Sequence, residues 1–259
     1  MLHGNPTWSY HFRNVVGALR DRFRCIVPDH IGLGLSDKPQ PPRYDYTLKS
    51  RVDDVTALLD HLGVRENVNL VLHDWGGMIG MAWAARRVPA VKRLVLMNTA
   101  AFHLPKAKRL PLRLWVGRNT RLGAWLVRSM NVFTRHAANV CVKRRPLPPE
   151  VREWYLKPYD SWENRVAILK FVQAIPLRPG DPGYDIVSEV EAAFPKFAHT
   201  PALICWGMKD FVFDRHFLEE FERRLPHAEV HRFPDCGHYL LEDAGDEVIP
   251  LIDRFLRAP

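Results

Sequence analysis

The chain has 259 residues, 47% of them hydrophobic and 25% charged, which suffices for one large domain with an inserted subdomain. It has no apolar run long enough to span a bilayer, no secretory signal at residues 1–6 and no metal-ligand spacing among its scattered cysteines, so we expect a soluble cytoplasmic protein with free thiols and no cofactor. The formal charge is +8, but no recognition motif accompanies it, which argues against nucleic-acid binding.

The predicted elements alternate between short β-branched runs and longer helical patterns. This alternation is typical of βαβ units and predicts an α/β fold with a mostly parallel sheet covered by helices on both faces. Apolar residues recur at helical spacing from Leu48 to Leu62, and Gly63 is well placed to end that helix. The expected strands cover residues 24–28, 69–73, 92–97, 202–206 and 228–233.

A sharp turn joins the second expected strand to the helix that follows it. The sequence around this turn reads His73-Asp74-Trp75-Gly76-Gly77, which resembles the nucleophile elbow usually written G-x-S-x-G. Asp74 stands where the serine would be. A carboxylate is ionised at neutral pH and needs no base to activate it, so it can attack carbon directly and form an ester. The alternative, that Asp74 only caps the helix, would not require a strand to end in Asp-Trp-Gly-Gly.

From residue 102 to about residue 195 the strand signal disappears and only helical patterns remain. We therefore predict a helical cap at 102–195, inserted between two parts of the core at 1–101 and 196–259.

This predicted cap is strongly basic, because residues 106–145 hold eleven Lys or Arg and no Asp or Glu. Its helical pattern predicts a packed helix with a solvated basic stripe, and the alternative is docking to an acidic partner or peripheral contact with anionic lipid. The apolar face comprises Leu122, Trp125, Leu126, Met130 and Phe133, and the stripe comprises Arg121, Arg128 and Arg135.

The last two strands are each followed by a candidate catalytic residue. An ester on Asp74 would be broken by a histidine that titrates near neutral pH, and His238 lies in the loop after the final strand. Asp210, after the preceding strand, is the candidate acid that orients it. The resulting order of nucleophile, acid and histidine is the one expected for a strand-elbow-helix site. Asp235 is a competing acid, which we interpret as a turn former.

Residues 3–6, with the sequence His-Gly-Asn-Pro, resemble a loop that supplies an oxyanion-hole amide. The backbone N–H groups of Asn5 and Trp75 would then contact the oxygens of the nucleophile or of a tetrahedral intermediate. Their side chains also carry N–H donors that could converge on a departing anion. Such an anion site beside a carboxylate nucleophile suits the expulsion of a halide or a carboxylate.

Together these motifs resemble the haloalkane dehalogenase family of α/β-hydrolases over nearly the whole chain. The shared motifs are residues 3–10, 28–39, 73–77, 207–210 and 237–238. Part of that family carries a catalytic glutamate where this chain has Asn98, which favours the later acid, Asp210. Segments 25–32 and 44–54 are most similar to the cis-β-lactone decarboxylases of bacterial olefin biosynthesis, which form an alkene and carbon dioxide. The resemblance implies a hydrophobic small-molecule substrate and, as partners, companion enzymes of olefin biosynthesis.

Several functions stay open on the sequence alone. The leading hypothesis is a lyase acting on a hydrophobic cis-β-lactone, and its close rival is hydrolytic dehalogenation of a haloalkane. Epoxide hydrolysis would require cap tyrosines as acids, for which Tyr155, Tyr159 and Tyr184 are available. A fourth reading is a catalytically silent binding protein that docks through its basic cap.

The chain departs from the family pattern at its start. Family members carry two strands and most of a third before the His-Gly motif, whereas here only Leu2 separates Met1 from that motif. We expect either a start further upstream or a fragment with N-terminal strands missing, and a fragment would lose sheet pairing and stability.

Overall fold

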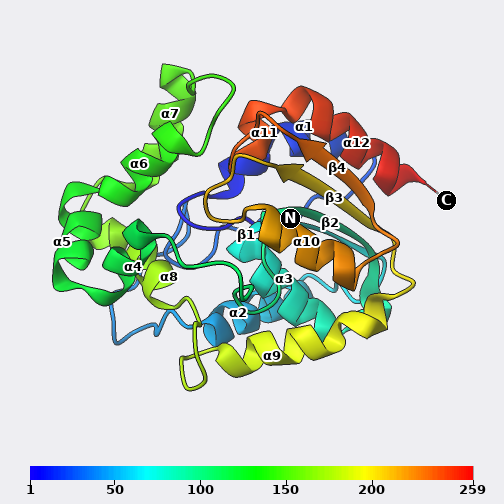
Figure 1. Cartoon of the computed structure of the whole chain (residues 1–259), viewed down its shortest axis with the longest axis horizontal. Helices are drawn as coiled ribbons and strands as arrows, with labels where there is room; N and C mark the ends of the chain where they lie inside the picture. Colours follow the sequence, from blue (N-terminus) through cyan, green and yellow to red (C-terminus); the bar gives the residue numbers. More distant parts are fainter. Residues whose placement is uncertain (259) are drawn as a thin grey trace.

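The computed structural model describes residues 1–258 and contains one parallel sheet with helices on both faces (Figure 1). The strands lie in the order in which they occur along the chain, and they pair in parallel throughout. Their carboxyl ends therefore meet at one edge of the sheet, where α/β folds place their sites. The strands are β1 (Val68–Asp74), β2 (Val91–Thr99), β3 (Ala202–Gly207) and β4 (Glu229–Phe233).

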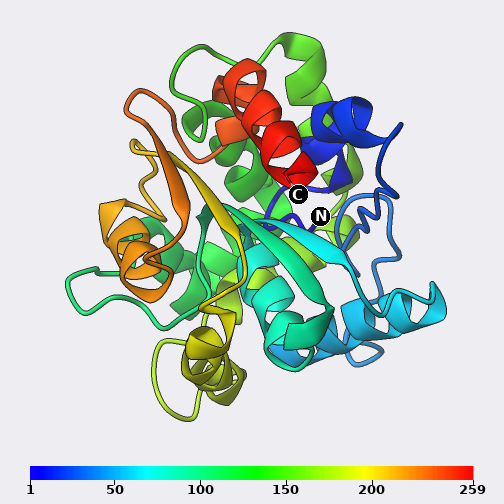
Figure 2. The ribbon, with the colours of Figure 1, turned by 90° about the vertical axis from the view of Figure 1, so that its right-hand side faces the viewer.

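Helices cover both faces of the sheet (Figure 2). The two faces bury different side chains because side chains alternate along each strand. On β2, Leu94 and Leu96 join the larger core, whereas Val95 and Met97 join the smaller one. The larger core lies against α2 (Leu48–His61), α3 (Trp75–Ala85), α9 (Tyr184–Ala193) and α10 (Arg215–Arg224). The smaller core lies against α1 (Arg13–Leu19), α11 (Leu240–Asp243) and α12 (Gly245–Arg257).

The predicted helix after the first expected strand is confirmed. Thr47 caps the start of α2 by accepting a hydrogen bond from the backbone N–H of Ser50, and Gly63 follows its end with a φ of 69°. This left-handed conformation favours glycine.

The strand expected at residues 24–28 is wrong, because no regular strand forms there. Apolar composition alone does not make a strand, since each strand needs a neighbour to pair with. The α-amino group of Met1 donates to the carbonyl of Ile26, and Leu2 forms a single parallel bridge with Leu72 of β1. The other four expected strands are present.

Between β2 and β3 the described chain is helical. Five helices lie beyond the carboxyl edge of the sheet (Figure 1). The sixth, α9, packs against α3 on one face of the sheet. The five are α4 (Leu112–Asn119), α5 (Arg121–Met130), α6 (Val132–Val140), α7 (Pro149–Leu156) and α8 (Val166–Gln173). Short 3-10 helices cover Ser9–Phe12, Val88–Ala90, Lys157–Tyr159, Glu163–Arg165 and Phe194–Phe197.

The basic segment differs from its predicted helix in two ways. Asn131, with a φ of 50°, separates α5 from α6, so Phe133 is not on the same helix as Trp125. The predicted apolar face also points outward, since Leu122 is 63% exposed and Trp125 is 54% exposed. The helix packs through Gly123 and Val127 instead, and a Cβ on Gly123 would come within 2.2 Å of the Val116 carbonyl oxygen. Of residues 1–258, no helix is both long and apolar enough to cross a membrane.

Candidate active site

Asp74 occupies a strained turn between β1 and α3. Its φ of 53° and ψ of −128° are unfavourable for a residue with a Cβ, and its side chain does not cap the helix that follows. The turn is tight because glycines let the neighbouring chain approach: a Cβ on Gly76 would lie 1.9 Å from the Leu2 carbonyl oxygen, and one on Gly77 would lie 1.8 Å from Thr99 Oγ1. Capping therefore does not account for Asp74, and the elbow geometry does.

The carboxylate of Asp74 is buried and held by two neighbours. Its Oδ1 accepts a hydrogen bond of 2.6 Å from the backbone N–H of Asn5, and its Oδ2 lies 3.5 Å from His238 Nε2. Gly4 packs so closely that an added Cβ would lie 1.8 Å from Asp74 Oδ1. The loop at residues 3–6 thus supplies a backbone amide to the nucleophile, as its sequence predicts.

A cluster of buried polar residues holds the loop at residues 3–6 in place. The carbonyl oxygen of His3 contacts His30 Nε2 at 3.0 Å, and the His30 backbone N–H donates to His3 Nε2 at 3.3 Å. Asp29 accepts from the backbone N–H groups of Ser9 and Leu35 at 2.6 and 2.7 Å. The glycines at positions 32 and 34, both with positive φ, allow the tight turn that follows Asp29.

Asp210 and His238 meet at the carboxyl ends of β3 and β4. Asp210 Oδ2 lies 2.7 Å from His238 Nδ1, and its Oδ1 accepts a hydrogen bond of 2.7 Å from the backbone N–H of Val212. The loops that carry them are joined, since the Lys209 N–H donates to the Cys236 carbonyl at 2.8 Å. Asp235, the competing acid, is turned outward and pairs with Arg144.

The charges at the site favour an ion-pair network. Burial by itself would raise the pKa of Asp74, but the hydrogen bond and charge of His238 hold that pKa below its usual value. Burial would likewise lower the pKa of His238, but Asp210 and Asp74 together raise it to about 10. At neutral pH an imidazolium therefore stands between two carboxylates, and Asp74 is ionised.

A column of two further histidines lies behind His238. Since a carbonyl can only accept, His73 Nε2 donates the 2.8 Å hydrogen bond to the His238 backbone carbonyl. The rings of His73 and His238 are 4.6 Å apart, and His11 packs on the other side of His73 at 4.5 Å. Burial lowers the pKa of His73 to about 4, so this ring is neutral at neutral pH. We did not predict this role for His73 from the sequence, although its place beside the nucleophile was a usable signal.

Asn98 and Thr99, at the end of β2, support the site from the neighbouring strand. Asn98 Nδ2 donates to Asp210 Oδ2 at 3.1 Å, and its side chain also bonds both the N–H and the carbonyl of Gly207. The Thr99 hydroxyl donates to the Asp74 carbonyl at 2.5 Å. The residue aligned with a family glutamate is therefore an amide that holds the later acid.

The side chains of Asn5 and Trp75 border the same cavity as Asp74 and His238. The Asn5 amide donates one hydrogen bond to the Ile168 carbonyl at 3.1 Å, which leaves its second N–H available. Within residues 1–258 the indole N–H of Trp75 makes no hydrogen bond, and its ring packs edge-on against Phe171. The two side chains are thus placed at the nucleophile, with part of the Asn5 amide already engaged.

The cavity above Asp74 has a volume of about 170 Å³ and is mostly apolar. Leu114 of α4, Phe133 of α6 and Val172 of α8 line it on the helical side. Phe213 and Phe217 line it beside His238. Such a lining suits an apolar substrate with a reacting centre at Asp74.

The cysteines have no place among these reacting groups. Cys236 is buried two residues before His238, but Cys141 is the cysteine that lines the cavity, which the sequence did not indicate. Burial raises the pKa of Cys141 well above its usual value, so it is a protonated thiol. Among residues 1–258 no group of three or more His, Cys, Asp or Glu side chains could hold a metal ion.

Comparison with known proteins agrees with this geometry. The α/β hydrolase fold family profile matches residues 1–245. The cis-3-alkyl-4-alkyloxetan-2-one decarboxylase of Shewanella oneidensis is 59% identical, over 99% of this chain and 80% of that protein. The enzyme of the same name from Xanthomonas campestris is 51% identical, over 99% and 87%. The crystal structure of the haloalkane dehalogenase DatA from Agrobacterium tumefaciens superposes with a TM-score of 0.85 at 27% identity, over 98% and 87% of the two chains.

Proposed function

Because this chain belongs to the α/β-hydrolase fold family, among the cis-3-alkyl-4-alkyloxetan-2-one decarboxylases and their haloalkane dehalogenase relatives, we propose that it decarboxylates a hydrophobic cis-β-lactone to an alkene and carbon dioxide. The observation that carries the proposal is the ionised carboxylate of Asp74 at a strained elbow, beneath an apolar cavity and within 3.5 Å of His238. The names of the two similar decarboxylases supply the substrate class.

In the first step, Asp74 attacks the alkyl-bearing ring carbon that is bonded to the ring oxygen, and not the carbonyl carbon. The new bond joins an Asp74 oxygen to that carbon, and the bond between that carbon and the ring oxygen breaks. The leaving group is a carboxylate, which stays attached to the substrate through the neighbouring carbon. The side chains of Asn5 and Trp75 and the imidazolium of His238 border the same cavity, where their N–H groups would stabilise this developing negative charge.

In the second step, the carboxylate leaves as carbon dioxide. The electrons of its carbon–carbon bond form the double bond, and the Asp74 ester bond breaks to restore the free carboxylate. No water and no net proton enter, so His238 acts by its charge and needs no deprotonation. Backside attack places the two departing groups opposite each other without rotation, so a cis lactone gives a cis alkene.

Haloalkane dehalogenation is the second candidate, because the indole N–H of Trp75 and an N–H of Asn5 border the cavity as donors to a halide would. In that reaction the alkyl ester on Asp74 is hydrolysed by water that His238 activates. Esterification removes the negative charge of Asp74, one of the causes that raise the pKa of His238, and so favours the neutral base.

Epoxide hydrolysis receives no support from the cap tyrosines. The Tyr155 hydroxyl donates to Glu242 at 2.6 Å, and the Tyr159 hydroxyl donates to the Thr7 carbonyl at 3.3 Å. Tyr184 stacks on His103. None of the three borders the cavity above Asp74.

The test offers purified enzyme a cis-β-lactone and, separately, a bromoalkane of similar chain length. We expect cis alkene from the lactone and little bromide from the bromoalkane. Asp74→Asn should abolish alkene formation, whereas Asp235→Asn, a matched change at an exposed acid, should not alter it. Bromide and alcohol without alkene would instead establish the dehalogenase, and no product from either would favour a binding role.

A further inference from the structure

An apolar helix face is left without a partner at the surface of the described chain. On α5, Leu122, Trp125 and Met130 are 63%, 54% and 50% exposed, while Gly123 and Val127 form the packed side. Burying such large apolar side chains would be favourable, so their joint exposure calls for an explanation.

The helices on either side of α5 carry further exposed apolar side chains. Leu112 is 74% exposed and Trp115 48% exposed on α4, and Val132 is 43% exposed on α6. Both helices pack against α5, and all three lie at the end of the molecule remote from β4 (Figure 1). We call these six residues the cap patch; its members are Leu112, Trp115, Leu122, Trp125, Met130 and Val132.

The cap patch lies within the segment that holds eleven basic and no acidic residues. Some of these cations pair with acids elsewhere, as Lys108 does with Asp214 and Arg118 with Asp181. Arg121 and Arg135 are exposed and form no ion pair within residues 1–258. Exposed tryptophan and leucine interleaved with arginine is the composition of an interfacial helix, whose apolar side enters the boundary between headgroups and acyl chains.

The positive charge of this segment argues against a second copy of the chain as the partner. A second copy of the chain, docked face to face, would bring two basic segments together and be repelled. We propose that the cap patch is a membrane-docking surface that binds an anionic lipid bilayer peripherally, with Arg121 and Arg135 at the headgroups and Leu122 and Trp125 at the acyl boundary.

The surface adjoins the catalytic cavity. Pro111 and Arg113 border that cavity, and Leu112, between them in the chain, is exposed as part of the cap patch. Phe133 borders the cavity as well, directly after Val132 of the patch. An apolar molecule dissolved in the bilayer would therefore meet the cavity wall close to the docked surface.

The test measures sedimentation of the full chain with vesicles, without substrate, so its result is independent of the proposed reaction. One vesicle is pure phosphatidylcholine and the other is equal parts phosphatidylcholine and phosphatidylglycerol. We expect binding to the second only, weakened by added salt because surface charges are screened. Arg121→Glu/Arg135→Glu should weaken binding about tenfold or more, given the contribution of each cation near an anionic surface.

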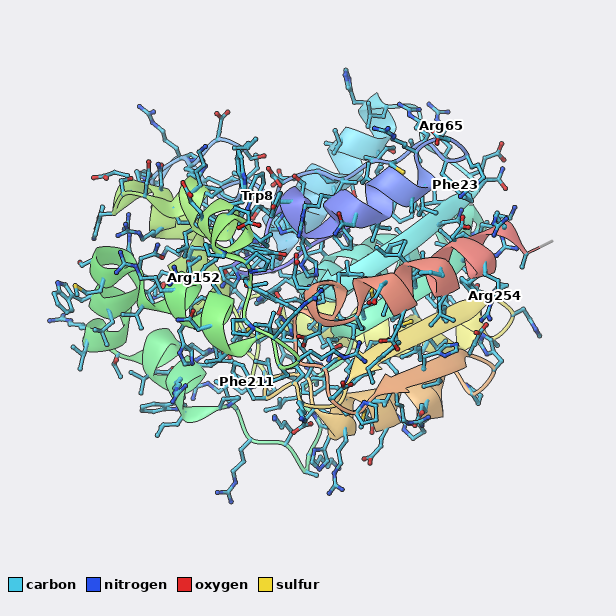
Figure 3. All side chains as sticks on the ribbon, turned by 90° about the horizontal axis from the view of Figure 1, so that it is seen from above. Trp8, Phe23, Arg65, Arg152, Phe211 and Arg254 are labelled. Carbon is cyan, nitrogen blue, oxygen red and sulfur yellow. The ribbon has the colours of Figure 1, made fainter. Side chains whose placement is uncertain are left out.

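The matched control is Arg20→Glu/Arg65→Glu, which makes the same change in charge away from the cap, with Arg65 on the opposite side of the molecule (Figure 3). It should bind as the unmodified chain does. Leu122→Ser/Trp125→Ser should weaken binding without a change of charge, and thermal unfolding would verify that every variant folds. Equal binding to both vesicles, no binding to either, or equal loss in the control would overturn the proposal. Salt-sensitive binding to companion enzymes in place of vesicles would identify an acidic protein partner instead.

Discussion

Asn98 donates a hydrogen bond of 3.1 Å to the same Asp210 oxygen that contacts His238. Val212 donates to the other oxygen of Asp210, so the two bonds together fix the carboxylate. Because an amide cannot ionise, Asn98 cannot replace Asp210 as the acid. The pairing explains how one position near the end of β2 supports the acid that follows β3.

Replacing Asn98 by alanine should lower both activity and stability. A hydrogen bond to a charged group contributes about 1.5–3 kcal/mol, so kcat should fall roughly tenfold to a hundredfold. The loss of two bonds to Gly207 should also lower the melting temperature. Steady-state kinetics on lactone and thermal unfolding would measure the two effects. An unchanged kcat in a folded Asn98→Ala variant would show that Asp210 needs no such support.

His73→Phe tests the histidine column behind the catalytic ring. Phenylalanine preserves most of the packing but cannot donate to the His238 carbonyl, which then stays buried without its 2.8 Å partner. We expect kcat to fall about tenfold, with KM little changed, because the substrate does not contact His73. His73→Gln, which retains an N–H donor, should recover part of the rate. Equal rates for the two variants would argue that only the packing of His73 matters.

The expected pH profile of the reaction follows from the shifted pKa values of Asp74 and His238. The pKa of Asp74 is lowered and that of His238 is raised to about 10, so the competent ion pair persists between these limits. We expect kcat/KM for lactone to be flat through neutral pH and to fall as the pH rises through about 10, when His238 loses its proton. A decline that begins near pH 7 would contradict this, and a rise above pH 7 would point to a neutral base.

Protein stability should depend on the same histidine. A folded-state pKa raised above the unfolded value of 6.5 stabilises the folded chain fully below 6.5, and the contribution is lost as the pH rises toward about 10. His238→Gln should therefore flatten the dependence of denaturant midpoint on pH between these values. A midpoint with the same pH dependence in both proteins would assign the proton uptake to another group.

Gly4→Ala should lower activity about a hundredfold, with a smaller effect on folding. The added Cβ would lie 1.8 Å from Asp74 Oδ1, so either the nucleophile or the loop that supplies the Asn5 N–H must move. A displacement of about 1 Å at a reacting centre can cost about a hundredfold in rate. Gly17→Ala is the matched control, because its Cβ would meet no atom within 4 Å. Full activity in Gly4→Ala would mean that the site is less tightly packed than its geometry indicates.

The sequence predicts the fold and the reacting groups better than it predicts the residues that hold those groups in place. The elbow, Asp210 and His238 follow from local patterns and chain order, because parallel strands bring their carboxyl ends together whatever their separation in sequence. The hydrogen bonds of His73 and Asn98 join residues 165 and 112 positions apart, which no local pattern reveals.

The two structural predictions that were wrong have physical reasons. The pattern at residues 24–28 is apolar, but strand formation depends on a neighbour that sequence does not specify. The amphipathic pattern of α5 is real, but periodicity does not tell which face packs, and the close approach at Gly123 selects the other one.

The most direct test of the account is acid quenching of the enzyme during turnover of a cis-β-lactone, followed by digestion and mass spectrometry. Acid protonates the freed carboxylate of the intermediate and so prevents loss of carbon dioxide. We predict that the peptide containing Asp74 gains the mass of one lactone and that Asp74 carries it. An adduct on another residue, or alkene formation at the full rate by Asp74→Asn with deamidation excluded, would contradict the account.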